Sequence, residues 1–122
     1  MPIAKIAKIA NKDAREYVRN RIVFDGSNLF ARYATDNLYV VYSYGFHFPM
    51  YIWDNTCGIW LRNVTEKSAS TAKHYSECCP ALPVHMTDFS VAEMVSIVDA
   101  KGLVGAIKQR VLTGKIGGMY GN

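Results

Sequence analysis

The sequence predicts an α+β fold, in which an antiparallel four-stranded meander sheet packs against an N-terminal helix and a C-terminal helix pair. Strand-like runs rich in β-branched and aromatic residues follow one another through the middle of the chain, separated by short turn sequences. Apolar residues recur at helical spacing before and after these runs. A sheet with helices on one face is the architecture that accommodates both patterns.

The length and composition indicate one domain. The chain has 122 residues, of which 50% are hydrophobic and 20% charged, which is enough apolar material for a packed core. We expect a single domain over residues 1–122 with flexible ends at about 1–10 and 116–122. The first ten residues repeat an Ile-Ala-Lys unit, which suits a loosely attached terminus, a frayed helical turn or an arm that orders on a partner.

The helices are predicted from spacing and capping residues. A first helix is expected from about Lys12 to Val23, with Asn11 as its N-cap. A short helix is expected from about Ser70 to Cys79, before two prolines.

The C-terminal helix pair has the strongest local signals. Ser90 and Glu93 form a capping-box sequence, and an apolar stripe follows it. Gly102 and Gly105 are expected to mark a break or close packing within the stripe, and Gly114 is expected to end it.

The four strands are predicted at residues 28–34, 38–43, 47–53 and 59–64. Asp, Asn and Gly residues between them supply turns and make three sequential hairpins. Pro49 lacks a backbone N–H, so the third strand is expected at a sheet edge or at a bulge.

Charge and cysteine content narrow the location and the partners. The net charge of +4 is compatible with an acidic partner such as nucleic acid. The three cysteines include an adjacent pair, Cys78 and Cys79, which argues against a secreted disulfide framework. No apolar run approaches the roughly 20 residues of a membrane span, and the first ten residues lack a signal-peptide core. We expect a cytosolic protein with reduced thiols and no membrane association.

A polar cluster after the last strand is the first candidate site; its members are Ser68, Ser70, Thr71, Lys73 and His74. Hydroxyl groups and a lysine at the start of a helix suit a phosphate or another anion. A hydrophilic loop with an ordinary serine cap is the alternative interpretation.

Metal binding and catalysis are weaker hypotheses. His74, Cys78 and Cys79 lie close in sequence, and His85 and Cys57 could complete a zinc site. His74 and Cys78 are four residues apart, as on one face of a helix, but the adjacent cysteines point apart. We expect reduced cysteines and no bound metal or cofactor.

A nucleophilic enzyme would use Cys57, Cys78 or Ser43 with His47 or His74, yet no protease or nucleophile-elbow signature surrounds them. A metal-free nuclease would use His47, His74, Lys73 and Tyr44.

The middle of the chain contains more aromatic side chains than one face of a small sheet can bury. They are Tyr39, Tyr42, Tyr44, Phe46, Phe48, Tyr51, Trp53 and Trp60, with His47 among them. Exposed members could stack on bases or anchor a protein interface, and they could also close a homodimer.

The segment from about Asp25 to His74 resembles a family of short, uncharacterised bacteriophage and plasmid proteins. The resemblance lies in YVVYSYG at residues 39–45, the following HFP, the strand that contains Trp60, and SASTAKH at residues 68–74. It implies a phage or mobile-element origin and no particular activity.

From the resemblance, the charge and the aromatic surplus we expect a small phage or mobile-element accessory protein in the cytoplasm of the bacterial host. It would bind a host protein, nucleoprotein complex or nucleic acid. Such binding could inhibit a host defence complex, as anti-CRISPR proteins do. The alternatives are a nucleic-acid or nucleotide binding protein and a small metal-dependent or His-dependent nuclease; we favour binding over catalysis. The expected binding residues are Ser43, Tyr44, His47, Trp53, Ser68, Ser70, Thr71, Lys73 and His74.

Overall fold

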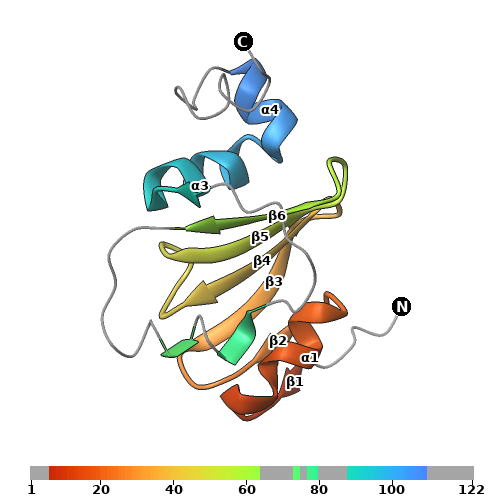
Figure 1. Cartoon of the computed structure of the whole chain (residues 1–122), viewed down its shortest axis with the longest axis vertical. Coiled ribbons are helices and arrows are strands. Elements are labelled where there is room, and N and C mark those ends of the chain that lie inside the picture. Colours follow the sequence, from red (N-terminus) through yellow and green to blue (C-terminus); the bar gives the residue numbers. More distant parts are fainter. Residues whose placement is uncertain (1–5, 64–72, 75–76, 80–87, 110–122) are drawn as a thin grey trace.

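A computed structural model of the chain describes residues 6–63, 73–74, 77–79 and 88–109. Their strands form one seven-stranded sheet in the order β1-β2-β3-β4-β5-β6-β7, and helices lie outside it (Figure 1). The expected α+β class is confirmed. Within these residues, no helix has both the length and the apolar character that crossing a membrane requires.

The predicted meander forms the centre of the sheet. Its strands are β3 (Leu29–Thr35), β4 (Leu38–Ser43), β5 (Pro49–Asp54) and β6 (Ile59–Asn63), and each pairs antiparallel with the next. This part of the prediction is confirmed.

Three two-residue strands extend the sheet beyond the meander. β2 (Phe24–Asp25) pairs antiparallel with β3, whereas β1 (Ala7–Lys8) and β7 (Asp88–Phe89) add parallel pairs at the two edges. The sheet is therefore mixed, and the expectation of four antiparallel strands was incomplete. Two residues are too few to produce the alternating pattern that reveals a strand in a sequence.

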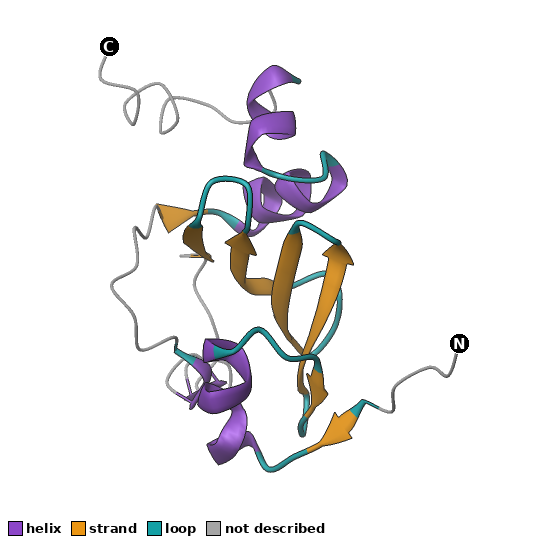
Figure 2. Ribbon diagram, turned by 90° about the vertical axis from the view of Figure 1, so that its right-hand side faces the viewer, coloured by secondary structure: helices purple, strands orange, loops and turns teal. Residues whose placement is uncertain are grey.

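Helices cover both faces of the sheet, so the expectation of helices on one face was wrong. Ala14 and Val18 of α1 (Ala14–Arg19) pack with Tyr39 and Val41 on one face. α3 (Val91–Asp99) and α4 (Leu103–Lys108) pack with Leu38, Val40 and Ile52 on the other. Figure 2 shows α1 and the C-terminal helices at opposite ends, with strands between them.

The sequence of β4 explains why both faces of the sheet are covered. All six of its residues are buried, because its apolar run continues on both sides of the strand instead of alternating with polar residues. Such a run is typical of a strand that is covered on both faces.

The first helix is shorter than predicted. A 3-10 turn, η1 (Asn11–Asp13), leads into α1, which ends at Arg19. Arg21 then adopts a left-handed conformation, and the amides of Arg21 and Ile22 bond back to Val18 and Tyr17 at 3.0 and 2.9 Å. This Schellman arrangement closes the helix four residues before the predicted end.

Pro49 occupies a central strand, so of the two predicted positions, a sheet edge or a bulge, the sheet edge does not apply. It is the first residue of β5, which lies between β4 and β6. The pairing with β4 shifts register between Val41 and Tyr42, where Tyr42 opposes Pro49. This register shift agrees with the second predicted position, a bulge, and the irregularity accommodates the missing N–H.

The C-terminal helix pair agrees with its local signals. Ser90 and Glu93 make both bonds of the capping box, and the chain breaks between the helices at Gly102, whose φ is 138°. Of the predicted helix at 70–79, the described residues 73–74 and 77–78 are helical. The remainder of that helix, Gly114 and the tail at 116–122 lie outside the described residues.

Candidate functional site

An open groove lies where the end of β4, the β2–β3 turn, η1 and the segment around His74 meet. Its volume is about 640 Å³, within the range of small-molecule sites. The lining residues are Ala10, Asn11, Lys12, Ser27, Asn28, Tyr44, Lys73, His74 and Glu77. We call this feature the Tyr44 groove.

One wall of the groove is built by the side chain of Asn11. Its Oδ1 accepts a hydrogen bond from the Ser27 amide at 2.8 Å, and its Nδ2 donates to the Ser27 carbonyl at 3.0 Å. Gly26 permits this approach, because a Cβ at position 26 would collide with Asn11 Oδ1. Asn11 was predicted to cap a helix, and this was wrong: no side-chain cap bond forms at η1, and the amide joins two segments instead.

Tyr44 provides the aromatic surface of the groove. Its backbone is left-handed with φ 67°, a conformation that non-glycine residues seldom adopt, and its amide donates to the Asn28 carbonyl at 2.9 Å. The side chain is 51% exposed, and its ring centroid lies 5.5 Å from that of His74. This strained turn conformation therefore places a half-exposed aromatic ring beside a histidine.

His74 is fixed by a buried partner. Ser43 Oγ and His74 Nδ1 lie 2.9 Å apart, and both residues are buried. Burial lowers the pKa of His74 below its usual value; Glu77 opposes this shift and Lys73 adds to it. The imidazole is therefore neutral at neutral pH, with Nδ1 engaged by Ser43.

The charged residues of the groove are two lysines and one glutamate. Lys12 and Lys73 are exposed, and neither takes part in an ion pair with any described residue. Glu77 is the acidic lining residue. The groove therefore combines two cations, a neutral histidine, amide and hydroxyl groups, and one aromatic ring.

Of the nine expected binding residues, the structure brings four together. Tyr44, Lys73 and His74 line the groove, and Ser43 lies behind His74. Ser68, Ser70 and Thr71 lie outside the described residues.

Two expected binding residues are described away from the groove. His47 is exposed in the β4–β5 turn and is not among the lining residues. Trp53 lies four residues along β5 from the Pro49 end, roughly 13 Å at strand spacing. The guanidinium of Arg21 sits 4.8 Å from its ring centroid.

Sequence reasoning missed six of the lining residues; these are Ala10, Asn11, Lys12, Ser27, Asn28 and Glu77. Asn28 has φ 56°, a conformation that asparagine tolerates. The residues Ser27-Asn28 are therefore typical of a turn, which the sequence alone can indicate. Nothing local indicates that this turn lies beside His74, 46 positions later in the chain.

The cysteines form no metal site in the described residues. No group of three His, Cys, Asp or Glu residues within them could hold a metal ion. Cys78 is fully buried, and burial raises the pKa of its thiol above the usual value. Burial also raises the pKa of Cys57. His85, the remaining zinc candidate, lies outside the described residues.

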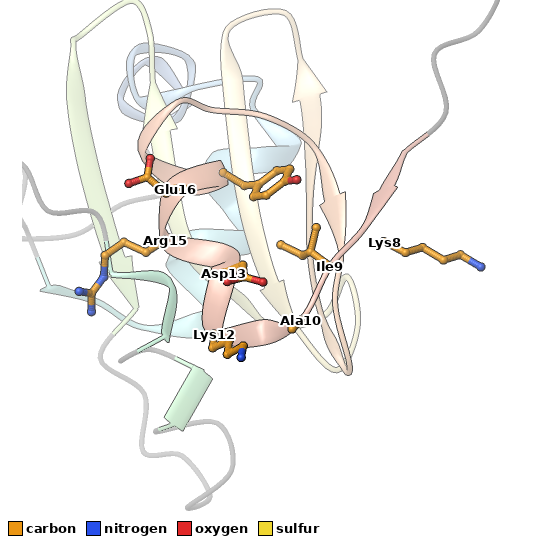
Figure 3. A pocket seen from close by; sticks show the side chains of 8 residues that line it. Lys8, Ile9, Ala10, Lys12, Asp13, Arg15 and Glu16 are labelled. Atoms are coloured by element: carbon orange, nitrogen blue, oxygen red, sulfur yellow. The ribbon is translucent and has the colours of Figure 1, made fainter.

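A second hollow adjoins the first beside α1. It is lined by Lys8, Ile9, Ala10, Lys12, Asp13, Arg15, Glu16 and Tyr17, and its volume is also about 640 Å³. Figure 3 shows Lys8 and Arg15 extending away in opposite directions, with Lys12 between them. Because its charged groups diverge, we regard the Tyr44 groove as the primary site and call this second feature the α1 hollow.

Comparisons with known proteins identified no relationship: no family model matches the chain, and neither the curated proteins nor the solved structures gave a match.

Proposed function

We propose that this protein binds nucleic acid through the Tyr44 groove. The observation that carries the proposal is the convergence of two exposed lysines and a half-exposed tyrosine on one concave surface. These are the two parts of sites that bind unpaired nucleic acid, namely cations for the backbone and an aromatic face for the base.

The cations supply the backbone part. Lys12 and Lys73 approach the groove from segments 61 positions apart in the chain, and neither charge is neutralised by an ion pair with a described residue. An ammonium group is a compact donor that suits a phosphate oxygen. Binding through two such contacts makes affinity depend on salt, with a slope of about −1.4 in log affinity against log salt for a single strand.

The aromatic and polar groups supply the base part. The side chain of Tyr44 is 51% exposed, and Asn28 lines the same groove. Stacking of a base on an aromatic ring contributes about 1–3 kcal/mol and tolerates every base.

Fluorescence anisotropy with labelled single-stranded RNA and DNA, titrated from about 50 to 200 mM salt, tests the proposal. Tyr44→Ala and the double variant Lys12→Ala/Lys73→Ala should each lower affinity. Lys108→Ala removes one positive charge from α4, which lies at the opposite end of the molecule from α1, and should change nothing (Figure 1). Absent binding, or affinity that ignores salt, contradicts the proposal.

Binding to a host protein is a second candidate, favoured by an aromatic cluster on the surface. Phe46 is 67% exposed, and its ring meets Phe30 and Tyr42 edge-on at 5.1 and 4.9 Å. This candidate keeps the phage or plasmid accessory role, including action on a host defence complex, as a proposal.

The host role is tested by phage growth in hosts with and without a defence system, comparing wild type with Phe46→Ser and Tyr44→Ala. Loss of the effect in Phe46→Ser alone would support protein binding. Loss in Tyr44→Ala alone would support the groove. No effect of the wild-type protein on phage growth in either host would contradict the accessory role.

A His-dependent nuclease at the same groove is favoured by one contact, the 2.9 Å pairing of Ser43 Oγ with His74 Nδ1. A neutral histidine held by a hydrogen bond at one nitrogen is the arrangement of an oriented general base. Cleavage of bound RNA that persists in EDTA and disappears in His74→Gln would support this activity. Binding without cleavage would leave the protein a binding protein.

A further inference from the structure

We propose that the Tyr44 groove and the α1 hollow form one continuous track for an extended single strand of nucleic acid, with Lys73, Lys12 and Lys8 as successive phosphate contacts. This inference rests on the proposed nucleic-acid binding and names the form of the ligand.

The two depressions adjoin each other, because they share lining residues. Ala10 and Lys12 border both of them, so the chain at the start of η1 forms the boundary over which a ligand would pass. Lys12 thus stands at the middle of the track, with Lys73 in the Tyr44 groove and Lys8 in the α1 hollow.

The charges along the track favour a polyanion. Lys8, Lys12 and Lys73 are exposed, and no ion pair of the described residues engages them. Of the acidic lining residues, Glu16 is paired with Arg19 at 3.3 Å, which leaves Asp13 and Glu77.

Arg15 is not counted as a contact of the track. It extends in the direction opposite to Lys8 (Figure 3), and its charge acts on Cys78. The track therefore has three lysines against three carboxylates, one of which, Glu16, is paired with Arg19. This balance predicts moderate, salt-sensitive affinity.

Each depression also offers a surface on which a base can rest. Tyr44 does so in the groove. In the α1 hollow, Ile9 and the ring of Tyr17 are partly buried, and Tyr17 packs edge-on against Phe24 at 5.8 Å. Bases of a duplex are stacked within the helix and present no free face, so these surfaces select an unpaired strand.

Oligonucleotides of increasing length, from a dinucleotide upward, test the track by anisotropy competition, with RNA and DNA of one sequence as separate arms. Affinity should rise with length until both depressions are filled. The rise should be larger than the statistical gain that a longer strand has because it can bind the same site in more positions. The salt slope for long strands should be about −2.1, from three contacts at about 0.7 each.

Lys8→Ala gives the decisive comparison. It should reduce the slope for long strands by about 0.7 and leave dinucleotide binding unchanged, whereas Lys12→Ala should weaken both. Lys108→Ala is the charge-matched control and should alter neither. Because these lysines are exposed, unchanged circular dichroism should confirm that each variant folds.

The outcomes separate the two proposals. If dinucleotides bind in a Tyr44-dependent manner but length and Lys8 have no effect, the track is wrong and the groove stands. Duplex binding as tight as single-strand binding also overturns the track. If no nucleic acid binds at all, the proposed function fails first and the track fails with it.

Discussion

Tyr44 combines an unfavourable backbone with an exposed ring. Left-handed geometry costs an L-residue roughly 1–2 kcal/mol, and the φ of 67° places Tyr44 there. A turn with glycine at this position would be more stable but would lack the ring that borders the groove. The residue therefore matters more for its surface than for the stability of its turn.

We predict that Tyr44→Gly is more stable than Tyr44→Ala by about 1 kcal/mol, because glycine relieves the left-handed strain while both variants lose the ring. Both should lose nucleic-acid affinity. Urea denaturation measures the difference in free energy of unfolding. The matched pair is Tyr33→Gly and Tyr33→Ala in β3, where the order should reverse because glycine weakens strands. Equal stability of the two Tyr44 variants would contradict the strain argument.

His74 should make stability depend on pH. Its pKa in the folded protein is lowered by burial, so the unfolded chain takes up the proton first as pH falls through about 6.5. The free energy of unfolding should be full above that pH and should fall in the window between 6.5 and the folded pKa.

Urea denaturation at about pH 7.5 and about pH 5.5 measures this dependence. In His74→Gln, the free energy of unfolding should decrease less between these two pH values than it does in the wild type. His47→Gln, which alters an exposed histidine, should retain the wild-type change. A wild-type protein whose stability is equal at the two pH values would refute the assignment.

At the scale of elements, one buried carboxylate joins two hairpins to the last helix. Asp54 Oδ1 accepts from the amides of Thr56 and Cys57 at 3.0 and 3.1 Å and from Asn37 Nδ2 at 3.2 Å. Its Oδ2 accepts from the Leu103 amide, in the first turn of α4, at 2.8 Å. Asp54 is thus the point at which β5 positions α4.

We predict that Asp54→Ala lowers the free energy of unfolding by about 3 kcal/mol or more, because it leaves several donors, including the buried Leu103 amide, without an acceptor. Asp36→Ala, in an exposed turn position, should change it by less than about 0.5 kcal/mol. Chemical denaturation monitored by fluorescence gives both values. Equal small effects would show that Asp54 does not join these elements.

The capping box of α3 gives a second prediction for an element. Ser90 Oγ accepts from the Glu93 amide at 3.2 Å, and Glu93 Oε1 accepts from the Ser90 amide at 3.0 Å. Ser90→Ala should destabilise the protein by about 1 kcal/mol. Ser96→Ala, inside the same helix, is the control and should be neutral or slightly stabilising, since alanine is the better helix former. The thermal midpoints of the two variants should therefore separate.

At the scale of the whole molecule, two cores share one sheet. Trp60 and Tyr39 belong to the core under α1, while Leu38 and Val40 belong to the core under α3 and α4. Adjacent residues of β4 therefore pack into opposite cores, so both cores depend on this one strand. Disruption of either core should disturb β4 and with it the other core, which should make unfolding cooperative.

We predict one unfolding transition. Fluorescence of Trp53 and Trp60 reports on the α1 side, and far-UV circular dichroism includes α3 and α4 on the other side. Their denaturation midpoints should coincide within error, as expected for a single domain. Loss of the helical signal before the tryptophan signal would indicate that the C-terminal helices form a separate unit.

The candidate site was predictable only in part. The sequence placed Ser43, Tyr44, Lys73 and His74 among its candidates because of residue type, and the structure brings these four together. The Ser43–His74 contact spans 31 positions and the Asn11–Ser27 contact 16. Such pairs leave no periodic pattern in a sequence, and the residues around Asn11 predict only a local helix cap.

The sequence by itself determined the central meander, its turns, and the capped helix pair, because each depends on contacts within a few residues: alternation along strands, glycine and asparagine in turns, and a serine that caps its own helix. Only the tertiary structure decided that helices cover both faces, that Pro49 lies in a central strand, and that η1 meets the β2–β3 turn beside His74. These features depend on contacts between distant segments, whose free energy comes from burial and hydrogen bonds that exist only after the chain has folded.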